Sequence, residues 1–335
     1  MALRPHVLIS SAGRRFGLLQ AVRESLQAKR PGAWVGAVDG GTSAPARFLA
    51  DRFWQVPRCT EPGYGAALLE ICRESGVGLV VPTIDTELPF YARSLVEFKA
   101  AGVDVFVSDE PVIAIACDKN ATHEWLVAQG FPTVRQASPA EALRRAGDWK
   151  WPLIAKPFNG SASVGVRRVE SAEELAYVAE TCPDYVVQEM ARGREFTVNL
   201  YVNAAGKCVC AVPHWRMETR GGEVSKGITV KDSRLMELAC LVAEALPGAR
   251  GPMNMQCFLD VDGPDKEATI AIIEINARFG GGYPLAHQAG ARFTDWLLDE
   301  QEGRSVGCYD GWTDDLAMLR YDEAVFTTGK AVMAV

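Results

Sequence analysis

The first third of the chain alternates short apolar runs with segments of helical periodicity. Regular alternation of buried strands and helices is typical of a doubly wound parallel sheet, whose ligands bind where the strands end. We therefore expect an α/β, Rossmann-like domain here. The predicted strands are His6–Ser11, Trp34–Asp39, Leu79–Pro82 and Val103–Val107, and the predicted helices are Leu18–Ala28 and Phe90–Ala101.

The pattern changes after Ile113. One helix is predicted from there to Gly130, and it carries Asp118 and Lys119. Shorter strands with polar ends and glycine-bearing turns follow. These strands are Trp151–Lys156, Asp184–Met190, Pro252–Asp260 and the apolar run that begins at Ala271.

Polar side chains alternate along the last of these strands. Glu274, Asn276 and Arg278 fall at period two and share one face. Carboxylate and amide oxygens suit a hard cation such as Mg²⁺, and a guanidinium suits a phosphate. Gln256 on the preceding strand would face Glu274 across a hairpin. The pattern therefore predicts a metal-nucleotide site, and the alternative is an edge strand with a solvated polar face.

A lysine and a flexible loop follow one another in the middle of the chain. Lys156 ends a predicted strand, and the Gly/Ser-rich segment Phe158–Gly165 comes directly after it. Such a loop can direct backbone N–H groups and hydroxyls at phosphate oxygens, and the lysine supplies the positive charge. No G-K-[ST] motif closes the loop, so it is not a P-loop. A surface hairpin loop is the alternative.

Two further patterns concern ligands. The strand that ends at Met190, followed by Glu195, is a natural slot for adenine, because main-chain groups can read a purine edge while an acid holds ribose hydroxyls. His214, Arg216 and Arg220 alternate along another predicted strand. Three cations on one face favour an anionic substrate or a triphosphate over a solvated edge.

Composition excludes several classes of protein. The chain has 335 residues, 48% of them hydrophobic, and a net charge of −7, which argues against a nucleic-acid surface. Nine cysteines without a C-x-x-C pair, and an early charged N-terminus without a signal peptide, predict a reducing cytoplasm. Cys208 and Cys210 are interpreted as core packing. No apolar run approaches the ~20 residues of a membrane span.

A dinucleotide site in the first domain is the main rival. Asp39 ends a predicted strand behind a glycine-bearing turn, as in NAD(P)-linked oxidoreductases. The glycines, Gly13 and Gly17, follow G-x-x-x-G instead of G-x-G-x-x-G, and Arg14 and Arg15 stand where small residues are needed. No Ser/His/Asp or Cys/His constellation is evident.

Lys119, Lys156, the Gly/Ser loop, QEM-x₂-G-x-E and Q…E-x-N-x-R occur in the order found in the ATP-grasp family. The chain most resembles the ATP-grasp module of the carbamoyl phosphate synthetase large subunit and biotin carboxylase, and more distantly D-alanine:D-alanine ligase. The resemblance covers nearly the whole chain. It implies a Rossmann-like N-terminal parallel sheet followed by an α+β, two-subdomain ATP-grasp fold, with ATP between the two sheets. The implied domains are residues 1–112 (pre-ATP-grasp), 113–185 (N-terminal or lid subdomain) and 186–335 (C-terminal subdomain with the metal site).

The resemblance also implies roles for individual residues. Gln256 stands where biotin carboxylase and D-alanine:D-alanine ligase have an acid, while the synthetase has glutamine, and Asp260 is a reserve ligand. Lys156 and Arg278 are the implied catalytic residues. The implied nucleotide contacts are Lys119, Lys156, Asn159, Gly160, Ser161, Ala162, Ser163, Val164, Gln188, Glu189, Met190 and Glu195, and the implied ligands of Mg²⁺ or Mn²⁺ are Gln256, Glu274 and Asn276.

Family members typically activate a carboxylate as an acyl phosphate, and an amine then displaces phosphate. We therefore expect an ATP-dependent carboxylate-amine ligase that releases ADP and phosphate; a non-catalytic nucleotide-binding homologue is a further alternative. Its partners would be a small carboxylate, such as an amino acid, and an amine, with no nucleic acid or membrane. A homodimer is the default assembly. The candidate substrate residues are Arg14, Arg15, Asp85, Glu87, His214, Arg216, Arg220, Tyr283 and His287.

Overall fold

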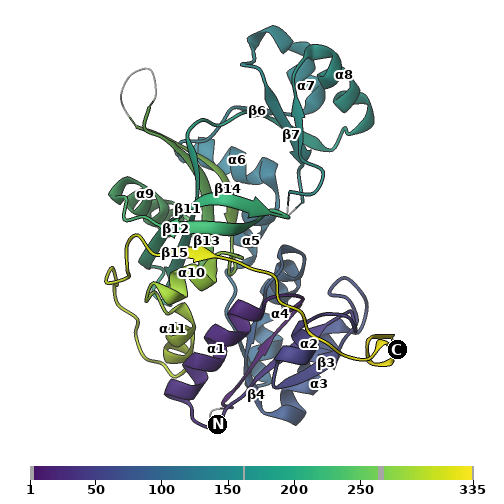
Figure 1. Ribbon diagram of the computed structural model, residues 1–335, viewed down its shortest axis with the longest axis vertical. Coiled ribbons are helices and arrows are strands. Elements are labelled where there is room, and N and C mark those ends of the chain that lie inside the picture. The colour runs from purple at the N-terminus through teal and green to yellow at the C-terminus, as the bar shows by residue number, and fades with distance from the viewer. Residues whose placement is uncertain (1–3, 161–162, 263–267, 334–335) are drawn as a thin grey trace.

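A parallel sheet opens the chain in the computed structural model, which describes residues 4–160, 163–262 and 268–333 (Figure 1). The strand order is β3-β2-β1-β4-β5, and each neighbouring pair is parallel. This confirms the predicted Rossmann-like sheet. Its strands are β1 (His6–Ile9), β2 (Val35–Asp39), β3 (Arg52–Gln55), β4 (Val77–Val81) and β5 (Asp104–Val105).

The edge strand β3 was not predicted. An edge strand has a neighbour on one side only, and both end residues of β3 are exposed. Its sequence RFWQ therefore lacks the longer apolar run by which the central strands were predicted. The central strand β4 is buried throughout and β1 is buried after His6, as their continuous apolar runs predict. The helices that connect the sheet are α1 (Phe16–Lys29), α2 (Ala46–Leu49), α3 (Tyr64–Ser75), the 3-10 helix η1 (Asp85–Glu87) and α4 (Leu88–Ala100).

The single helix predicted after Ile113 is in fact two helices, α5 (Glu110–Cys117) and α6 (Lys119–Ala128). Asp118 separates them in an extended conformation, and its carboxylate accepts hydrogen bonds from the backbone N–H groups of Asn120 and Ala121. Asp118 therefore acts as the N-cap of α6, which competes with continuation of the helix through this residue. The break places Lys119 at the beginning of a helix.

A small antiparallel sheet follows and projects away from the first sheet (Figure 1). Its order is β6-β9-β7-β8, and its hydrophobic core, which includes Trp149 and Leu153, is separate from those of the other sheets. Its elements are β6 (Gln136–Ala137), α7 (Pro139–Arg144), η2 (Ala146–Asp148), β7 (Leu153–Pro157), β8 (Arg167–Val169), α8 (Ala172–Thr181) and β9 (Tyr185–Glu189).

The largest sheet is antiparallel, with the order β14-β13-β10-β11-β12-β15. Its strands are β10 (Arg194–Val202), β11 (Cys208–Arg220), β12 (Glu223–Thr229), β13 (Gly251–Asp260), β14 (Thr269–Asn276) and β15 (Ala317–Leu319). The remaining helices are α9 (Ser233–Ala245), α10 (Tyr283–Gln288), α11 (Phe293–Gln301) and α12 (Gly329–Met333).

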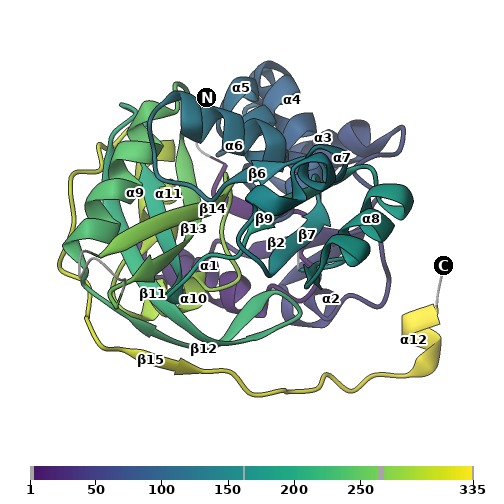
Figure 2. The same cartoon turned by 90° about the horizontal axis from the view of Figure 1, so that it is seen from above.

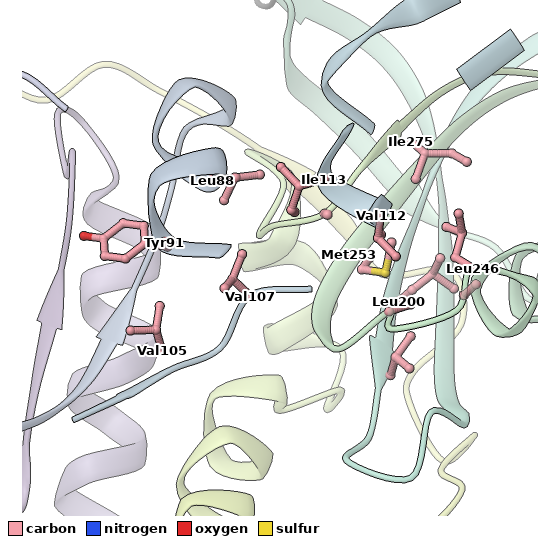
Figure 3. Packing of buried hydrophobic residues seen from close by; sticks show 14 of the residues in the cluster. Leu88, Tyr91, Val105, Val107, Val112, Ile113, Leu200, Leu246, Met253 and Ile275 are labelled. Carbon is pink, nitrogen blue, oxygen red and sulfur yellow. The ribbon is translucent and has the colours of Figure 1, made fainter. Parts of the chain in front are cut away.

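One hydrophobic core joins the parallel sheet to the largest sheet (Figure 3). Tyr91 and Val105 lie on the side of the parallel sheet, and Met253 and Leu200 belong to the largest sheet. Ile113 of α5 lies between them. The two sheets are thus packed together through a shared, close-packed core.

Cys208 and Cys210 are buried and free, which confirms their interpretation as core packing. Within residues 4–160, 163–262 and 268–333, no helix combines the length and the apolar character needed to cross a membrane.

Candidate functional site

Two cavities adjoin one another between the sheets. The first cavity, of about 600 Å³, lies between the small sheet and the largest sheet, and its polar lining comes mainly from β7, β9, β13 and β14. The second cavity, of about 1060 Å³, lies beside α1, β12 and the C-terminal segment. The predicted site residues that line the first cavity are Arg15, Asp85, Lys119, Lys156, Gly160, Ser163, Val164, Gln188, Glu189, Met190, Glu195, Arg216, Gln256, Glu274, Asn276 and Arg278.

The hairpin of β13 and β14 forms one wall of the first cavity. Gln256 pairs with Glu274, and Asn254 pairs with Asn276, so the predicted cross-strand facing is confirmed. A bulge follows Gln256. Asp260 accepts a hydrogen bond from the backbone N–H of Asp262 at 3.1 Å, so the reserve ligand stabilises the turn instead of lining the cavity.

Lys119 and Lys156 reach the first cavity from two different elements. The Lys119 ammonium donates to the Gly160 carbonyl at 2.6 Å, and its nitrogen lies 3.9 Å from a Glu274 oxygen. Burial lowers the pKa of Lys156 to about 8, and the charge of Glu274 opposes that shift. Two lysines beside one carboxylate leave an excess of positive charge, which favours binding of a polyanion.

Arg216 holds Glu195 in place. Its guanidinium lies 2.9 Å from a Glu195 oxygen, and it also donates to the Thr197 hydroxyl and the Gly222 carbonyl. Burial raises the pKa of Glu195, and the charge of Arg216 opposes this effect. Glu195 therefore already neutralises Arg216. Of the three predicted cations His214, Arg216 and Arg220, Arg216 is thus not available to bind an anionic ligand by itself.

Arg278 lies two residues beyond β14, where it connects that strand to the parallel sheet. It donates to both carboxylate oxygens of Asp85, at 2.8 and 2.5 Å, to Asn276 Oδ1 at 3.0 Å and to the Phe279 carbonyl at 3.1 Å. Burial would lower the pKa of Arg278, but Asp85 outweighs it and the pKa is raised. Four of the five N–H groups of the guanidinium thus have acceptors, and the orientation of the group is fixed.

The oxygen ligands on this wall fit a hard cation. Among the residues that the structure describes, no group of three or more His, Cys, Asp or Glu side chains could hold a metal ion. A cation here would therefore depend on the Glu274 carboxylate and on amide oxygens of Gln256 and Asn276. Mg²⁺ accepts such a small protein contribution when phosphate and water oxygens complete its shell.

Three predicted substrate residues are buried and line neither cavity. Glu87 has no exposed surface and accepts hydrogen bonds from Ser11, Tyr64 and the backbone N–H groups of residues 83 and 84. His214 is fully buried, and burial lowers its pKa to about 3, so it is neutral. Tyr283 packs in the core, where its hydroxyl accepts from the Thr294 N–H. Neither cavity is lined by these three residues, because sequence spacing does not reveal depth, and their contact with a substrate stays a prediction.

The remaining predicted residues have other positions. Asn159 is not among the residues lining the first cavity, and Ser161 and Ala162 lie outside the described residues. Arg14, Arg220 and His287 line the second cavity. His287 is nevertheless largely buried, with its Nε2 3.1 Å from a Glu24 oxygen.

The second cavity also contains charged residues that sequence reasoning missed. Glu223 lies 3.2 Å from Arg15 and 3.2 Å from Arg320. Burial would raise the pKa of Glu223, but the two arginines outweigh it and the pKa is lowered. Glu223 and Arg320 belong to no motif, and their 97-residue separation gave no local signal that they would meet.

Close approach of neighbouring groups explains the glycine run beside Arg278. A Cβ atom at Gly281 would lie 2.7 Å from the Glu223 carboxyl carbon, and one at Gly282 would lie 2.6 Å from a His214 ring nitrogen. A larger residue would displace the Glu223 side chain. The run therefore shapes the boundary between the two cavities, and it does so without the backbone strain of a positive φ at these positions.

The carboxylate of Asp39, which a dinucleotide site would need for a ribose, accepts hydrogen bonds from the N–H groups of Gly13 and Gly41, at 2.8 and 2.9 Å. The acid therefore stabilises the turn that a nucleotide would have to approach. This geometry does not favour the NAD(P) alternative.

Two known protein families match this chain, one over the parallel sheet and one over most of the part that follows it. Residues 7–106 match the PylC-like, N-terminal domain family, and residues 116–282 match the ATP-grasp domain family. The D-alanine–D-alanine ligase of Pseudomonas fluorescens is 27% identical over 182 residues, which are 49% of this chain and 56% of that protein. The formate-dependent phosphoribosylglycinamide formyltransferase of Bifidobacterium longum is 28% identical over 215 residues, 58% of this chain and 51% of that protein. The chain spans about half the length of these curated relatives.

Solved structures share the fold. The biotin carboxylase domain of Hydrogenobacter thermophilus 2-oxoglutarate carboxylase, in complex with MgADP, ADP and bicarbonate, has a TM-score of 0.72 at 16% identity, over 93% of this chain and 73% of that chain. The L-amino acid ligase of Bacillus licheniformis has a TM-score of 0.65 at 20% identity, over 90% of this chain and 75% of that chain.

Proposed function

We propose that this chain, a member of the ATP-grasp superfamily with a PylC-like N-terminal domain, is an ATP-dependent carboxylate-amine ligase. The observation that carries the proposal is the first cavity, where Lys119, Lys156, the Glu274 carboxylate and the oriented Arg278 guanidinium line a single space. The reaction would convert a carboxylate into an acyl phosphate, which an amine then attacks with release of phosphate. ADP leaves when the acyl phosphate forms, and the amide forms when phosphate is displaced.

The residues of the first cavity would divide the binding of ATP and Mg²⁺ between the two sheets. We assign the triphosphate to Lys119, Lys156 and the loop that includes Gly160, Ser163 and Val164. The adenine falls to Gln188, Glu189 and Met190 at the end of β9, and the ribose to Glu195. Gln256, Glu274 and Asn276 supply oxygen ligands for the cation, which when bound would neutralise phosphate charge.

The chemistry needs charge neutralisation and positioning, and no covalent nucleophile. Lys156 brings a positive charge to phosphate oxygens in a buried place, where electrostatic interactions are stronger than in water. Arg278 presents its remaining N–H to the transferred phosphoryl group or to the acid substrate. Because Asp85 fixes the guanidinium beforehand, little reorganisation accompanies the reaction.

The proposal extends to the whole molecule. The domain boundaries would be residues 1–112, 113–185 and 186–335, with the middle part acting as the lid. The substrates would be a small carboxylate, such as an amino acid, and an amine. The enzyme would act in the cytoplasm, without nucleic acid and as a homodimer.

A phosphate-release screen tests the function. The purified protein is incubated with ATP and Mg²⁺ and with pairs drawn from a panel of carboxylates and amines. We expect at least one pair to release phosphate together with ADP, and the omission of either partner to slow it. ATP binding without phosphate release over the whole panel would instead support the non-catalytic nucleotide-binding alternative.

A further inference from the structure

We infer that the C-terminal segment Leu316–Val325 forms part of the acid-substrate site, and that Arg320 binds the anionic group of that substrate. The inference rests on the proposed ligase function, because it assigns the acid to the second cavity. None of the sequence motifs includes this segment.

The C-terminal segment forms one wall of the second cavity. Its strand β15 pairs with β12, and the Arg320 backbone N–H donates to the Ser225 carbonyl at 2.9 Å. Beyond β15 the segment continues in extended form along the edge of the molecule to α12 (Figure 2). Residues 316–325 all line the second cavity, opposite the beginning of α1. Segments from near the two ends of the chain therefore line this cavity together.

The segment is attached on both sides of the cavity. Arg220 donates to both carboxylate oxygens of Asp322, at 2.8 and 2.6 Å. Further on, the Thr42 hydroxyl donates to the Val332 carbonyl at 2.6 Å, and Arg47 donates to the Ala331 carbonyl at 2.8 Å. The first contact ties the C-terminal segment to β11 of the largest sheet, and the others tie α12 beyond it to the loop after β2 and to α2. Arg320 is therefore positioned before any substrate binds.

Positive charge exceeds negative charge where the two cavities meet. Arg15 and Arg320 share the single carboxylate of Glu223, and Arg320 also donates to the Gly281 carbonyl. Arg14 lies near Glu223 but has no salt bridge among the described residues, and its charge contributes to the lowered pKa of that acid. Three guanidinium groups thus surround the Glu223 carboxylate, and Asp85 is a second acid near Arg15. This local excess of guanidinium groups, two of them partly buried, favours an anionic ligand.

The arginines around Glu223 lie close to the first cavity. We therefore infer that they bind the carboxylate of the substrate that reacts, and not an anionic group elsewhere on that substrate. Arg15, Glu223, Val224, Gly280 and Gly281 line both cavities, so they form the passage between them. Burial lowers the pKa of Arg15, and the nearby Arg278 guanidinium lowers it further while Glu223 opposes both. A carboxylate bound to Arg320 and Arg15 would thus lie on the Arg278 side of the second cavity, facing the phosphoryl donor.

Thermal unfolding in the presence of candidate acids tests the inference. The probes are the twenty proteinogenic amino acids, acetate and succinate, each added with ADP and Mg²⁺ at constant ionic strength. We expect at least one acid to raise the unfolding temperature of the wild type. Because a charge-assisted hydrogen bond is lost, Arg320→Ala should raise the half-saturating concentration of that acid about 10- to 100-fold. Arg320→Lys should recover part of the loss, since it keeps the charge but not the fork of donors.

Two controls separate this inference from the proposed function. Arg234→Ala removes an exposed arginine of α9 that lines neither cavity, and it should leave the acid titration unchanged. Stabilisation by ADP and Mg²⁺ alone reports on the first cavity, and its absence would count against the ligase proposal itself. Two results would overturn the inference while ADP and Mg²⁺ still stabilise the protein. One is an equal half-saturating concentration of the acid in the wild type and in Arg320→Ala. The other is a panel in which no acid stabilises the wild type. If Arg320→Ala does not fold, Arg320→Gln and Arg320→Lys take its place.

Discussion

The two cavities differ in how far apart their residues lie along the chain. The hairpin wall of the first cavity comes from residues 254–278, and its facing side chains follow strand alternation. The second cavity combines residues 14–24, 220–225, 279–288 and 316–325. The first arrangement is local, because a strand directs every second side chain to one face. The second exists only after distant segments have packed together, so no spacing rule describes it.

The charges of the two cavities differ in the same way. In the first cavity, Arg216 and Arg278 each have a protein carboxylate of their own. At the passage into the second cavity, Arg15 and Arg320 share Glu223. The ion pairs of Arg216 and Arg278 fix the orientation of site residues. The arrangement of Arg15 and Arg320 around Glu223 leaves positive charge available for a ligand. The following predictions separate these two uses of charge.

The largest effect is expected from the charged residues of the first cavity. Lys156→Ala and Glu274→Ala should each lower the rate of ADP formation about 10²- to 10³-fold, since each removes a preorganised charge near the phosphoryl group. Steady-state coupled assays measure the rate, and circular dichroism checks the fold. Lys207→Ala, which removes an exposed lysine paired with Glu244, is the matched control and should keep wild-type turnover. Unchanged turnover in Lys156→Ala or Glu274→Ala would refute the assignment of that residue.

A smaller effect is expected from the carboxylate that orients Arg278. Asp85→Asn replaces a bidentate ion pair with a neutral amide, and kcat should fall about 10- to 100-fold while KM for ATP changes little. The unfolding free energy should fall by about 3 kcal/mol, because a mostly buried guanidinium loses its counter-charge. Asp104→Asn, on β5 of the parallel sheet, is the control because its partner Lys99 is exposed. Equal kcat in the two variants would show that Asp85 does not position Arg278.

The lowered pKa of Lys156 predicts a pH dependence of ATP binding. Burial lowers this pKa from 10.5 to about 8, so the free protein loses the ammonium charge as the pH rises through 8. ATP affinity should therefore fall above pH 8, by up to about tenfold per pH unit. The unfolded state holds this proton up to its own pKa, so the contribution of Lys156 to folding stability rises between pH 8 and 10.5. Calorimetric titrations from pH 6.5 to 9.5 measure the affinity.

Lys156→Arg tests the assignment of this pH dependence. An arginine stays protonated over the whole pH range. The affinity of the Lys156→Arg variant for ATP should therefore change little with pH, even if this variant binds ATP more weakly than the wild type. The same decline in affinity in Lys156→Arg and in the wild type would trace the pH dependence to another group.

The smallest effect is expected at Tyr283, which lies in neither cavity. Tyr283→Phe removes the hydroxyl that accepts from the Thr294 N–H and lies 3.2 Å from His287 Nδ1. The unfolding free energy should fall by about 1 to 3 kcal/mol, because buried polar groups lose a partner. Urea unfolding measures the change. KM for either substrate should stay as in the wild type, and an increase in KM would restore Tyr283 as a substrate contact.

The strand patterns predicted much of the first cavity. Lys156 at the end of β7 and Gln256 opposite Glu274 follow from alternation and from hairpin geometry. Depth was not predictable in the same way. His214 and Arg216 share a strand face by spacing, yet His214 is buried and neutral while Arg216 is paired with Glu195. Glu87, two residues from Asp85, is likewise buried, because the short helix η1 turns the two acids in different directions.

The sequence by itself determined the order of the sheets, the alternating faces of their strands and the types of residue that hold charge in the first cavity. These features depend on neighbours along the chain, whose geometry a strand or a cap dictates. Tertiary structure alone decided that Arg320 from the C-terminal segment meets Arg15 and Glu223, and that Asp85 fixes Arg278. Such contacts depend on how separate sheets pack and on which polar groups are left to neutralise one another, and no local periodicity records either.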